Sequence, residues 1–186
     1  KTGTITQNRL HVSNLLYGER ELSAEYCHYD ESEVYSGLEQ GALQLLATSH
    51  LCNNFDSSQE LSDSSIDLAL KNFSEKNFKY NKIQNAYRVL NEIEFNNTNK
   101  YHVKIFEVND LSVNEFLFGY KAKDKLEENG GLLLAKGAPD YLKPKLKWII
   151  NMNDGGRKEL DKDLIEKVID IQNEWSLKGI LFKSLF

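Results

Sequence analysis

Two runs of the chain are rich in β-branched and aromatic residues and flank a short polar segment. Residues 86–94 read Ala-Tyr-Arg-Val-Leu-Asn-Glu-Ile-Glu, and residues 100–106 read Lys-Tyr-His-Val-Lys-Ile-Phe. This composition is typical of strands, because such side chains fit a pleated, half-buried surface. The pattern therefore predicts two strands that meet at a corner formed by Phe95-Asn96-Asn97-Thr98-Asn99.

The corner combines groups that suit a nucleotide. An aromatic ring such as that of Phe95 stacks on a base, amides and hydroxyls form hydrogen bonds, and an ammonium such as that of Lys100 meets a phosphate as a point charge. The competing interpretation is an ordinary polar turn in which Phe95 belongs to the core. The residues of the corner leave both interpretations open.

Apolar residues at helical spacing predict three amphipathic helices. The first covers residues 37–51 and follows Ser36 as its N-cap, with Glu39 in the capping-box position. The second runs from about residue 66 to 75 behind a cap at Ser64 or Ser65, and the third covers residues 160–177. The expected buried stripes are Leu38, Ala42, Leu45, Leu46, Ser49 and Cys52 in the first helix, and Leu164, Val168, Ile171 and Trp175 in the third.

The remaining segments carry weaker patterns. Pro139 fits the first turn of a further helix. The other expectations are a strand over residues 4–12, a turn at Tyr17-Gly18, a loop over residues 24–35, a strand over residues 114–123 with Phe116 and Phe118 on one face that returns as a hairpin into residues 132–135, a helix over residues 141–150 interrupted by Pro144, a turn at residues 153–156, and a final strand over residues 179–186.

Composition narrows the class of protein. The 186 residues are 40% hydrophobic and 27% charged, which fits one soluble globular domain. The net charge of -5 argues against general nucleic-acid binding. Cys27 and Cys52 lack partners at metal-ligand spacing, and the chain contains neither an apolar run of membrane-spanning length nor a Walker-type phosphate loop. The start at Lys1 without Met indicates a piece of a longer protein.

Three segments, in the same order, resemble P-type cation-transporting ATPases. Residues 95–101, Phe-Asn-Asn-Thr-Asn-Lys-Tyr, resemble the adenine-site motif F-N-S-T-N-K-Y of that family. Residues 1–8, Lys-Thr-Gly-Thr-Ile-Thr-Gln-Asn, resemble the phosphorylation signature D-K-T-G-T-[LI]-T-x-N without its Asp, and residues 136–139 match the motif K-G-A-P. Each motif alone is weak or suggestive, but three in sequence are specific, and together they span essentially the whole chain.

This resemblance implies a fold and a domain organisation. The fold is α+β, a twisted antiparallel sheet of about six to seven strands flanked by helix pairs. Residues 1–6 are expected to be a remnant of the phosphorylation domain, and residues 7–186 the nucleotide-binding domain. The implied function is ATP binding in the cytoplasmic part of a membrane pump that transports cations through an aspartyl-phosphate. ATP, Mg²⁺ in the full-length enzyme, and the phosphorylation, actuator and transmembrane domains of the same polypeptide are the implied partners.

The resemblance also implies roles for individual residues. Adenine is expected to stack on Phe95, with Asp67 and His102 at its edge. Asp67 comes from Ser-Ile-Asp-Leu-Ala-Leu at 65–70, which resembles the family's S-x-[DE]-x-A-L, and His102 stands where sodium–potassium pumps have Gln. The remaining assignments are Lys100 and Lys136 near the ring and phosphates, Gly137 where a ligand approaches the backbone, and Lys1 and Thr2 beside the phosphorylated Asp, with no metal ligand inside the fragment.

The last strand departs from the family. The usual G-x-R-V-L carries an Arg that reaches the phosphates, and Gly179 or Leu181 stands there in this chain. Lys178 or Lys183 is a candidate for partial compensation. Because of this departure, the alternative function of an interaction scaffold that has lost ATP affinity stays open. A soluble hydrolase of the haloacid-dehalogenase type, which shares the opening motif, is disfavoured because it needs neither residues 95–101 nor residues 136–139. The fragment alone is not expected to hydrolyse ATP.

Overall fold

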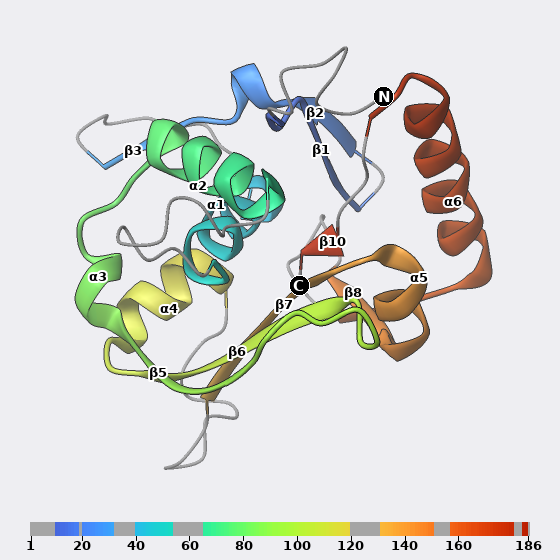
Figure 1. Ribbon diagram of the computed structural model, residues 1–186. Helices are drawn as coiled ribbons and strands as arrows, with labels where there is room; N and C mark the ends of the chain where they lie inside the picture. Colours follow the sequence, from blue (N-terminus) through green and yellow to red (C-terminus); the bar gives the residue numbers. More distant parts are fainter. Residues whose placement is uncertain are drawn as a thin grey trace.

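The structure is a computed structural model of all 186 residues, shown in Figure 1. It describes residues 10–18, 20–31, 40–53, 65–119, 131–150, 157–180 and 184–185. Several sequence-based expectations fall outside these residues, namely those for Lys1 and Thr2, most of the first strand, the cap at Ser36, the turn at residues 153–156, and Lys183.

The largest sheet among the described residues has four antiparallel strands in the order β10-β7-β6-β5. The predicted strands on either side of the polar corner are confirmed as β5 (Tyr87–Ile93) and β6 (Tyr101–Val108). Strand β7 (Gly131–Gly137) continues the sheet, and β10 (Ser184–Leu185) is its short edge. The α+β class is confirmed, but a single sheet of six to seven strands is not found in the described part of the chain, because the other strands pair off in twos.

The described residues also form three two-stranded sheets outside this central sheet. Strands β1 (Asn14–Tyr17) and β2 (Arg20–Ser23) form a hairpin, and the predicted turn is confirmed by Gly18, whose φ of 58° suits glycine. Residues 24–35, which were expected to form a loop, contain the 3₁₀ turn η1 and the short strand β3. The remaining elements are η1 (Ala24–Tyr26), the parallel pair β3 (Tyr29–Asp30) and β4 (Phe78–Lys79), and the antiparallel pair β8 (Trp148–Ile150) and β9 (Arg157–Glu159).

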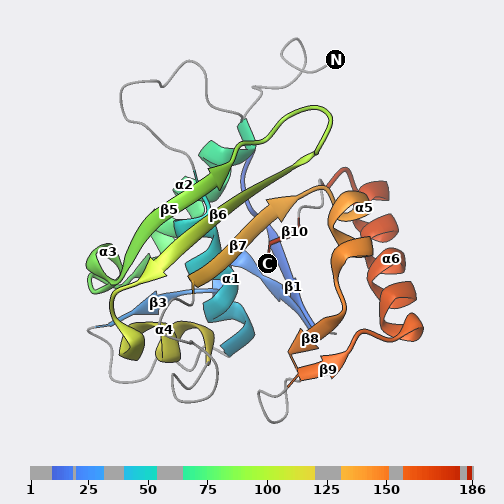
Figure 2. The ribbon, with the colours of Figure 1, turned by 90° about the horizontal axis from the view of Figure 1, so that it is seen from below.

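Helix α1 (Gln40–Leu51) lies against one face of the central sheet, with α2 (Ser65–Asn77) beside it (Figures 1 and 2). Both agree with the predicted helices, and Ala42, Leu46, Ser49 and Cys52 of the predicted stripe are buried. The main core contains these α1 side chains together with Phe106 and Leu134 of the sheet. Because side chains alternate along a strand, His102 and Lys104 share this face with Phe106.

Residues 111–118 form helix α4 (Leu111–Phe118), so the strand predicted over residues 114–123 is wrong over its described part. Helix caps decide the structure here. The carboxylate of Asp110 accepts hydrogen bonds from the N–H groups of Ser112 and Val113, and Gly119 ends the helix at a φ of 72°. The predicted hairpin into residues 132–135 is therefore also wrong, and β7 pairs with β6 and β10 instead.

The helix predicted over residues 141–150 is confirmed only at residues 141–142 and is wrong beyond them. Helix α5 (Pro139–Leu142) has Pro139 in its first turn as expected, and it is followed by the 3₁₀ turn η2 (Lys143–Lys145). Pro144 cannot donate the backbone hydrogen bond that an α-helix needs, and residues 148–150 then join β8. Short α3 (Ile83–Ala86) completes the connection before β5.

The predicted C-terminal helix is confirmed as α6 (Lys162–Leu177), which is capped by Asp161. Leu164 and Trp175 are buried as expected. Lys178 is the C-cap of this helix, and its Nζ lies 2.5 Å from Glu174 Oε1 at the surface. Gly179, just after this C-cap, has a φ of 77°, and the described part of the predicted final strand is β10. Lys178 therefore belongs to the end of α6, where it is paired with Glu174.

Candidate functional site

The polar corner between β5 and β6 is built around Asn96. Its side-chain Oδ1 accepts hydrogen bonds from the backbone N–H groups of Thr98 at 2.9 Å and Asn99 at 2.7 Å, which form a local turn. The carbonyl oxygen of Asn96 accepts a further bond from the N–H of Lys100 at 2.9 Å. Lys100 has a φ of 57°, a left-handed conformation that closes the corner, and its Nζ donates to Asn97 Oδ1 at 3.2 Å.

Phe95 lies at the surface of this corner. Its side chain is 50% exposed, so the interpretation that places Phe95 in the core is wrong. The ring is therefore accessible to a planar ligand.

Sheet register brings the other predicted site residues to the same end of the sheet. Strand β6 leaves the corner at Tyr101, and β7 runs antiparallel to it and ends at Gly137. Tyr101 is opposite Gly137, and His102 is opposite Lys136. His102 and Lys136 consequently lie on the face covered by α1 and α2, directly inward from the corner.

Asp67, in the first turn of α2, forms an ion pair with Lys136 of β7. Asn53, just after α1, joins the same group. Its Oδ1 accepts from Lys136 Nζ at 3.1 Å, and its Nδ2 donates to the backbone carbonyl of Asp67 at 2.9 Å. Lys136 is only 4% exposed, while the Asp67 carboxylate is partly accessible. The pair thus presents its acid to the surface and keeps its ammonium beneath.

His102 is also nearly covered, at 2% exposure, and its Nε2 lies 2.7 Å from Glu92 Oε1. A carboxylate only accepts hydrogen bonds, so Nε2 carries the proton and the neutral ring keeps Nδ1 as an acceptor. Burial lowers the pKa of His102, and the nearby Lys136 ammonium lowers it further, against an opposing effect of the bond to Glu92. The ring is therefore neutral near pH 7.

Lys104 is a member of this cluster that sequence reasoning missed. Its side chain is 9% exposed, and its Nζ donates to the carbonyl oxygen of Asn53 at 2.7 Å. Burial lowers the pKa of Lys104, while Glu92, its partner in the strand register, favours the charged form. The sequence signal that could have identified Lys104 was its spacing from His102, since residues two apart in a strand share a face.

Gly137 has a packing role in this structure. A Cβ atom at this position would lie 2.6 Å from Tyr101 Cβ, 2.9 Å from Leu142 Cδ1 and 3.0 Å from the Lys100 carbonyl oxygen. The space that a side chain would fill is thus occupied by β6 and α5. The missing side chain permits the close approach of these elements, so a ligand would meet Gly137 through its backbone.

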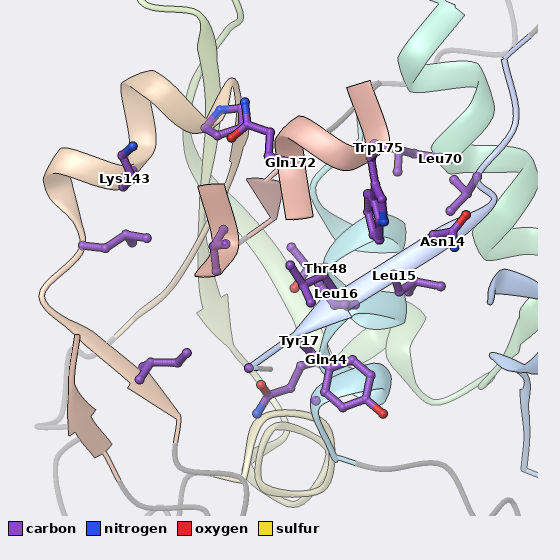
Figure 3. Close-up of a pocket in the computed structure, with 18 of the residues that line it drawn as sticks. Asn14, Leu15, Leu16, Tyr17, Gln44, Thr48, Leu70, Lys143, Gln172 and Trp175 are labelled. Carbon is purple, nitrogen blue, oxygen red and sulfur yellow. The ribbon is translucent and has the colours of Figure 1, made fainter. Parts of the chain in front are cut away.

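A large apolar cavity of about 860 Å³ lies elsewhere, between α1, β1 and α6. Figure 3 shows Trp175 of α6 pointing toward the side of the cavity formed by Leu16 and Thr48. Its described lining includes none of Asp67, Phe95, Lys100, His102, Lys136 and Gly137. The cavity and the candidate site are therefore separate features of the described residues.

Comparison with known families decides the relationship suggested by the motifs. The profile of the family described as P-type ATPase, cytoplasmic domain N, matches residues 41–180. The chain belongs to this family. Across the described residues, no three His, Cys, Asp or Glu side chains gather where they could hold a metal ion, and no helix has the length and apolar character to cross a membrane.

Individual relatives agree with this assignment. The chain is 29% identical over 174 residues to human potassium-transporting ATPase alpha chain 2, covering 87% of this chain and 15% of the relative. It is 25% identical over 178 residues to the sodium/potassium-transporting ATPase subunit alpha-A of Artemia franciscana, covering 89% of this chain and 16% of the relative. The Drosophila melanogaster sodium/potassium-transporting ATPase subunit alpha is 27% identical over 163 residues. The chain thus spans about one-sixth of the length of these relatives.

Proposed function

We propose that this P-type ATPase domain binds ATP at the end of its central sheet, with adenine stacked on Phe95. The observation that carries the proposal is the coincidence of an exposed ring and a partly accessible carboxylate, Asp67, at the sheet end where the family's motifs meet. A stacked base contributes about 1–3 kcal/mol. Asp67 then accepts a hydrogen bond from the exocyclic amino group of adenine, which selects for that base.

The buried residues support the ligand from beneath. Lys136 pairs with Asp67 and contributes positive potential, and His102 offers its Nδ1 as an acceptor at the adenine edge. Lys100, at the surface of the corner, is the cation placed best to meet phosphate oxygens. Gly137 contributes through its backbone.

In the whole protein, residues 7–186 form the nucleotide-binding domain and residues 1–6 begin the phosphorylation domain. The domain delivers the γ-phosphate to an Asp that precedes Lys1. That carboxylate attacks the γ-phosphorus of ATP, the bond from phosphorus to the bridging oxygen breaks, and ADP leaves, which gives an aspartyl-phosphate. Lys1 and Thr2 would lie beside the transferred phosphoryl group, and Thr2 would help to hold Mg²⁺. Together with the phosphorylation, actuator and transmembrane domains of the same polypeptide, this reaction drives cation transport, with the present domain on the cytoplasmic side.

Titration of the ¹⁵N-labelled chain with ATP tests the binding step. Amide signals of residues 94–102 and 136–138 are expected to shift, with a Kd on the order of 1 mM because one stack and a few polar contacts only modestly exceed the cost of association. Mg²⁺ should change this Kd little, and the isolated chain should not turn over ATP. Shifts confined to residues remote from this sheet end, or no shifts at 10 mM ATP, would support the scaffold alternative, which the missing strand arginine favours.

A further inference from the structure

Asn53 connects three elements that meet beneath the candidate site. Its backbone carbonyl accepts from Lys104 on β6, its Oδ1 accepts from Lys136 on β7, and its Nδ2 donates to the Asp67 carbonyl on α2. Asn53 follows the last turn of α1, so it is held at the point where α1, α2 and the sheet converge. One residue thus fixes both members of the Asp67–Lys136 pair.

Lys104 fixes Asn53 in turn. The Lys104 ammonium is almost fully buried and lies near two carboxylates, those of Glu92 and Asp67. Glu92 is opposite Lys104 in the strand register and is also hydrogen-bonded to His102. A buried ammonium that donates at 2.7 Å to a backbone carbonyl holds that carbonyl firmly, because charge-assisted bonds are short and strong.

We propose that Lys104 is a positioning residue that acts through Asn53 to aim the Asp67 carboxylate at the 6-amino group of the purine. This inference rests on the ATP site proposed above. Lys104 itself is covered and does not need to touch the nucleotide. Its loss should therefore change the choice between bases, since Asp67 would stay in the site but lose its fixed orientation.

Comparison of ATP with inosine triphosphate, which carries a 6-oxo group in place of the amino group, isolates this effect. Both probes carry the same triphosphate, so any change in electrostatic potential alters their affinities equally. The parent chain should prefer ATP. In Lys104→Met, which keeps an unbranched side chain and removes the ammonium, ATP affinity should fall about tenfold, the loss expected for one charge-assisted hydrogen bond, and inosine triphosphate affinity should change little.

Three further variants and one control sharpen the test. Asn53→Ala should lose the same preference, and the double variant Lys104→Met/Asn53→Ala should lose no more than either single change, because the two residues act in series. Lys104→Arg keeps a cationic donor and should recover part of the preference. Lys79→Met is the control, since Lys79 is an exposed lysine paired with Asp30 on the distant β3–β4 sheet.

The outcomes separate the two proposals. A parent chain that binds neither nucleotide would refute the ATP site itself. A parent that binds both equally, or a Lys104→Met chain that keeps the full preference for ATP, would refute the positioning role and leave the ATP site intact. Equal weakening of both nucleotides in Lys104→Met would also refute it, because that result indicates a general structural or electrostatic effect.

Discussion

Glu92 of β5 reaches diagonally across the sheet to His102 of β6, with Glu92 Oε1 2.7 Å from His102 Nε2. The residue directly opposite Glu92 is Lys104, so the carboxylate lies between a buried imidazole and a buried ammonium. On the other side of His102 lies Lys136. This arrangement explains why a histidine in such a site stays neutral, since two ammonium groups and burial outweigh one carboxylate.

The neutral state of His102 predicts a dependence of stability on pH. Its pKa in the folded chain is below the ordinary value of 6.5, so the unfolded chain binds a proton first as the pH falls. The contribution of neutral His102 to the free energy of unfolding is fully present above about pH 6.5. It should decline as the pH falls from there toward the pKa of His102 in the folded state. Thermal unfolding between pH 7.5 and 5.0 measures this decline.

His102→Gln provides the control for this pH dependence. Burial also lowers the pKa of His50, so only the difference between the parent and His102→Gln reports on His102. The decline in melting temperature should be shallower in the variant. Identical slopes in the two chains would show that His102 does not titrate in this window.

Removal of the Phe95 ring should affect binding and leave stability nearly unchanged. Phe95→Ala is expected to weaken ATP binding by about 1–3 kcal/mol, the contribution of one base stack. Because the side chain is half exposed, the free energy of unfolding should fall by far less than the 3–5 kcal/mol typical of a buried Phe. Nucleotide titration and thermal unfolding of the same preparation measure both effects.

Phe116→Ala is the matched control for Phe95→Ala. Phe116 is 40% exposed and lies on α4 against Tyr29 and Tyr80, away from the sheet end. This change should cost some stability through the lost ring contacts and leave ATP affinity unaltered. Equal loss of affinity in both variants would count against stacking on Phe95.

Disruption of the Asp67–Lys136 pair should lower the free energy of unfolding. In Lys136→Met the Asp67 carboxylate and Asn53 Oδ1 both lose a cationic donor in a largely buried environment. The expected loss is about 1–3 kcal/mol of unfolding free energy, the range for an unsatisfied buried group. Denaturant unfolding of Lys136→Met, Asp67→Asn and the double variant gives the coupling energy of the pair.

The exposed pair Lys178–Glu174 offers a comparison in the same chain. Lys178→Met should leave the free energy of unfolding nearly unchanged, because water and salt screen a surface ion pair. If the two lysine substitutions were equally mild, the Asp67–Lys136 pair would not be a structural contact of any importance.

Gly137→Ala should destabilise the chain through a steric clash. The added methyl group would meet Tyr101 Cβ at 2.6 Å and the Lys100 carbonyl oxygen at 3.0 Å, so the strands must separate at the site. Overpacking of this kind costs about 1–3 kcal/mol. Gly119→Ala is the control, since a Cβ there meets nothing within 4 Å and the cost is limited to the strain of a φ of 72°, about 1 kcal/mol. A melting temperature for Gly137→Ala at or above that of Gly119→Ala would contradict this prediction.

Local sequence determined the elements whose signals lie within a few residues. Strands β5 and β6 follow from β-branched and aromatic composition, the β1–β2 turn from Gly18, and α1, α2 and α6 from helical spacing. Pro139 predicted the start of α5 because its fixed φ suits a first helical turn. The motifs at residues 95–101 and 136–139 likewise predicted the family to which the chain belongs.

Residues 114–118 show where a local pattern misleads. The alternation of Phe116 and Phe118 predicted a strand, but Val113 and Leu117 are one helical turn apart and both are buried. The capping groups Asp110 and Gly119 were the local signal that sequence reasoning missed. Side chains of α1 add to this choice, because Gln40 and Gln44 donate to the last carbonyl groups of α4 from more than 70 residues away.

Tertiary structure alone decided how the candidate site is supported. Lys136 meets Asn53 across 83 residues of sequence and Asp67 across 69, and Lys104 meets Asn53 across 51. No local propensity encodes such contacts, because they arise only when the strand register and the packing of α1 and α2 bring these side chains together. Sequence therefore determined which residues are candidates for the nucleotide. The fold decided which of them reach the surface, as Phe95 and Asp67 do, and which lie beneath it, as His102, Lys104 and Lys136 do, because a buried polar or charged group persists only where partners from other elements surround it.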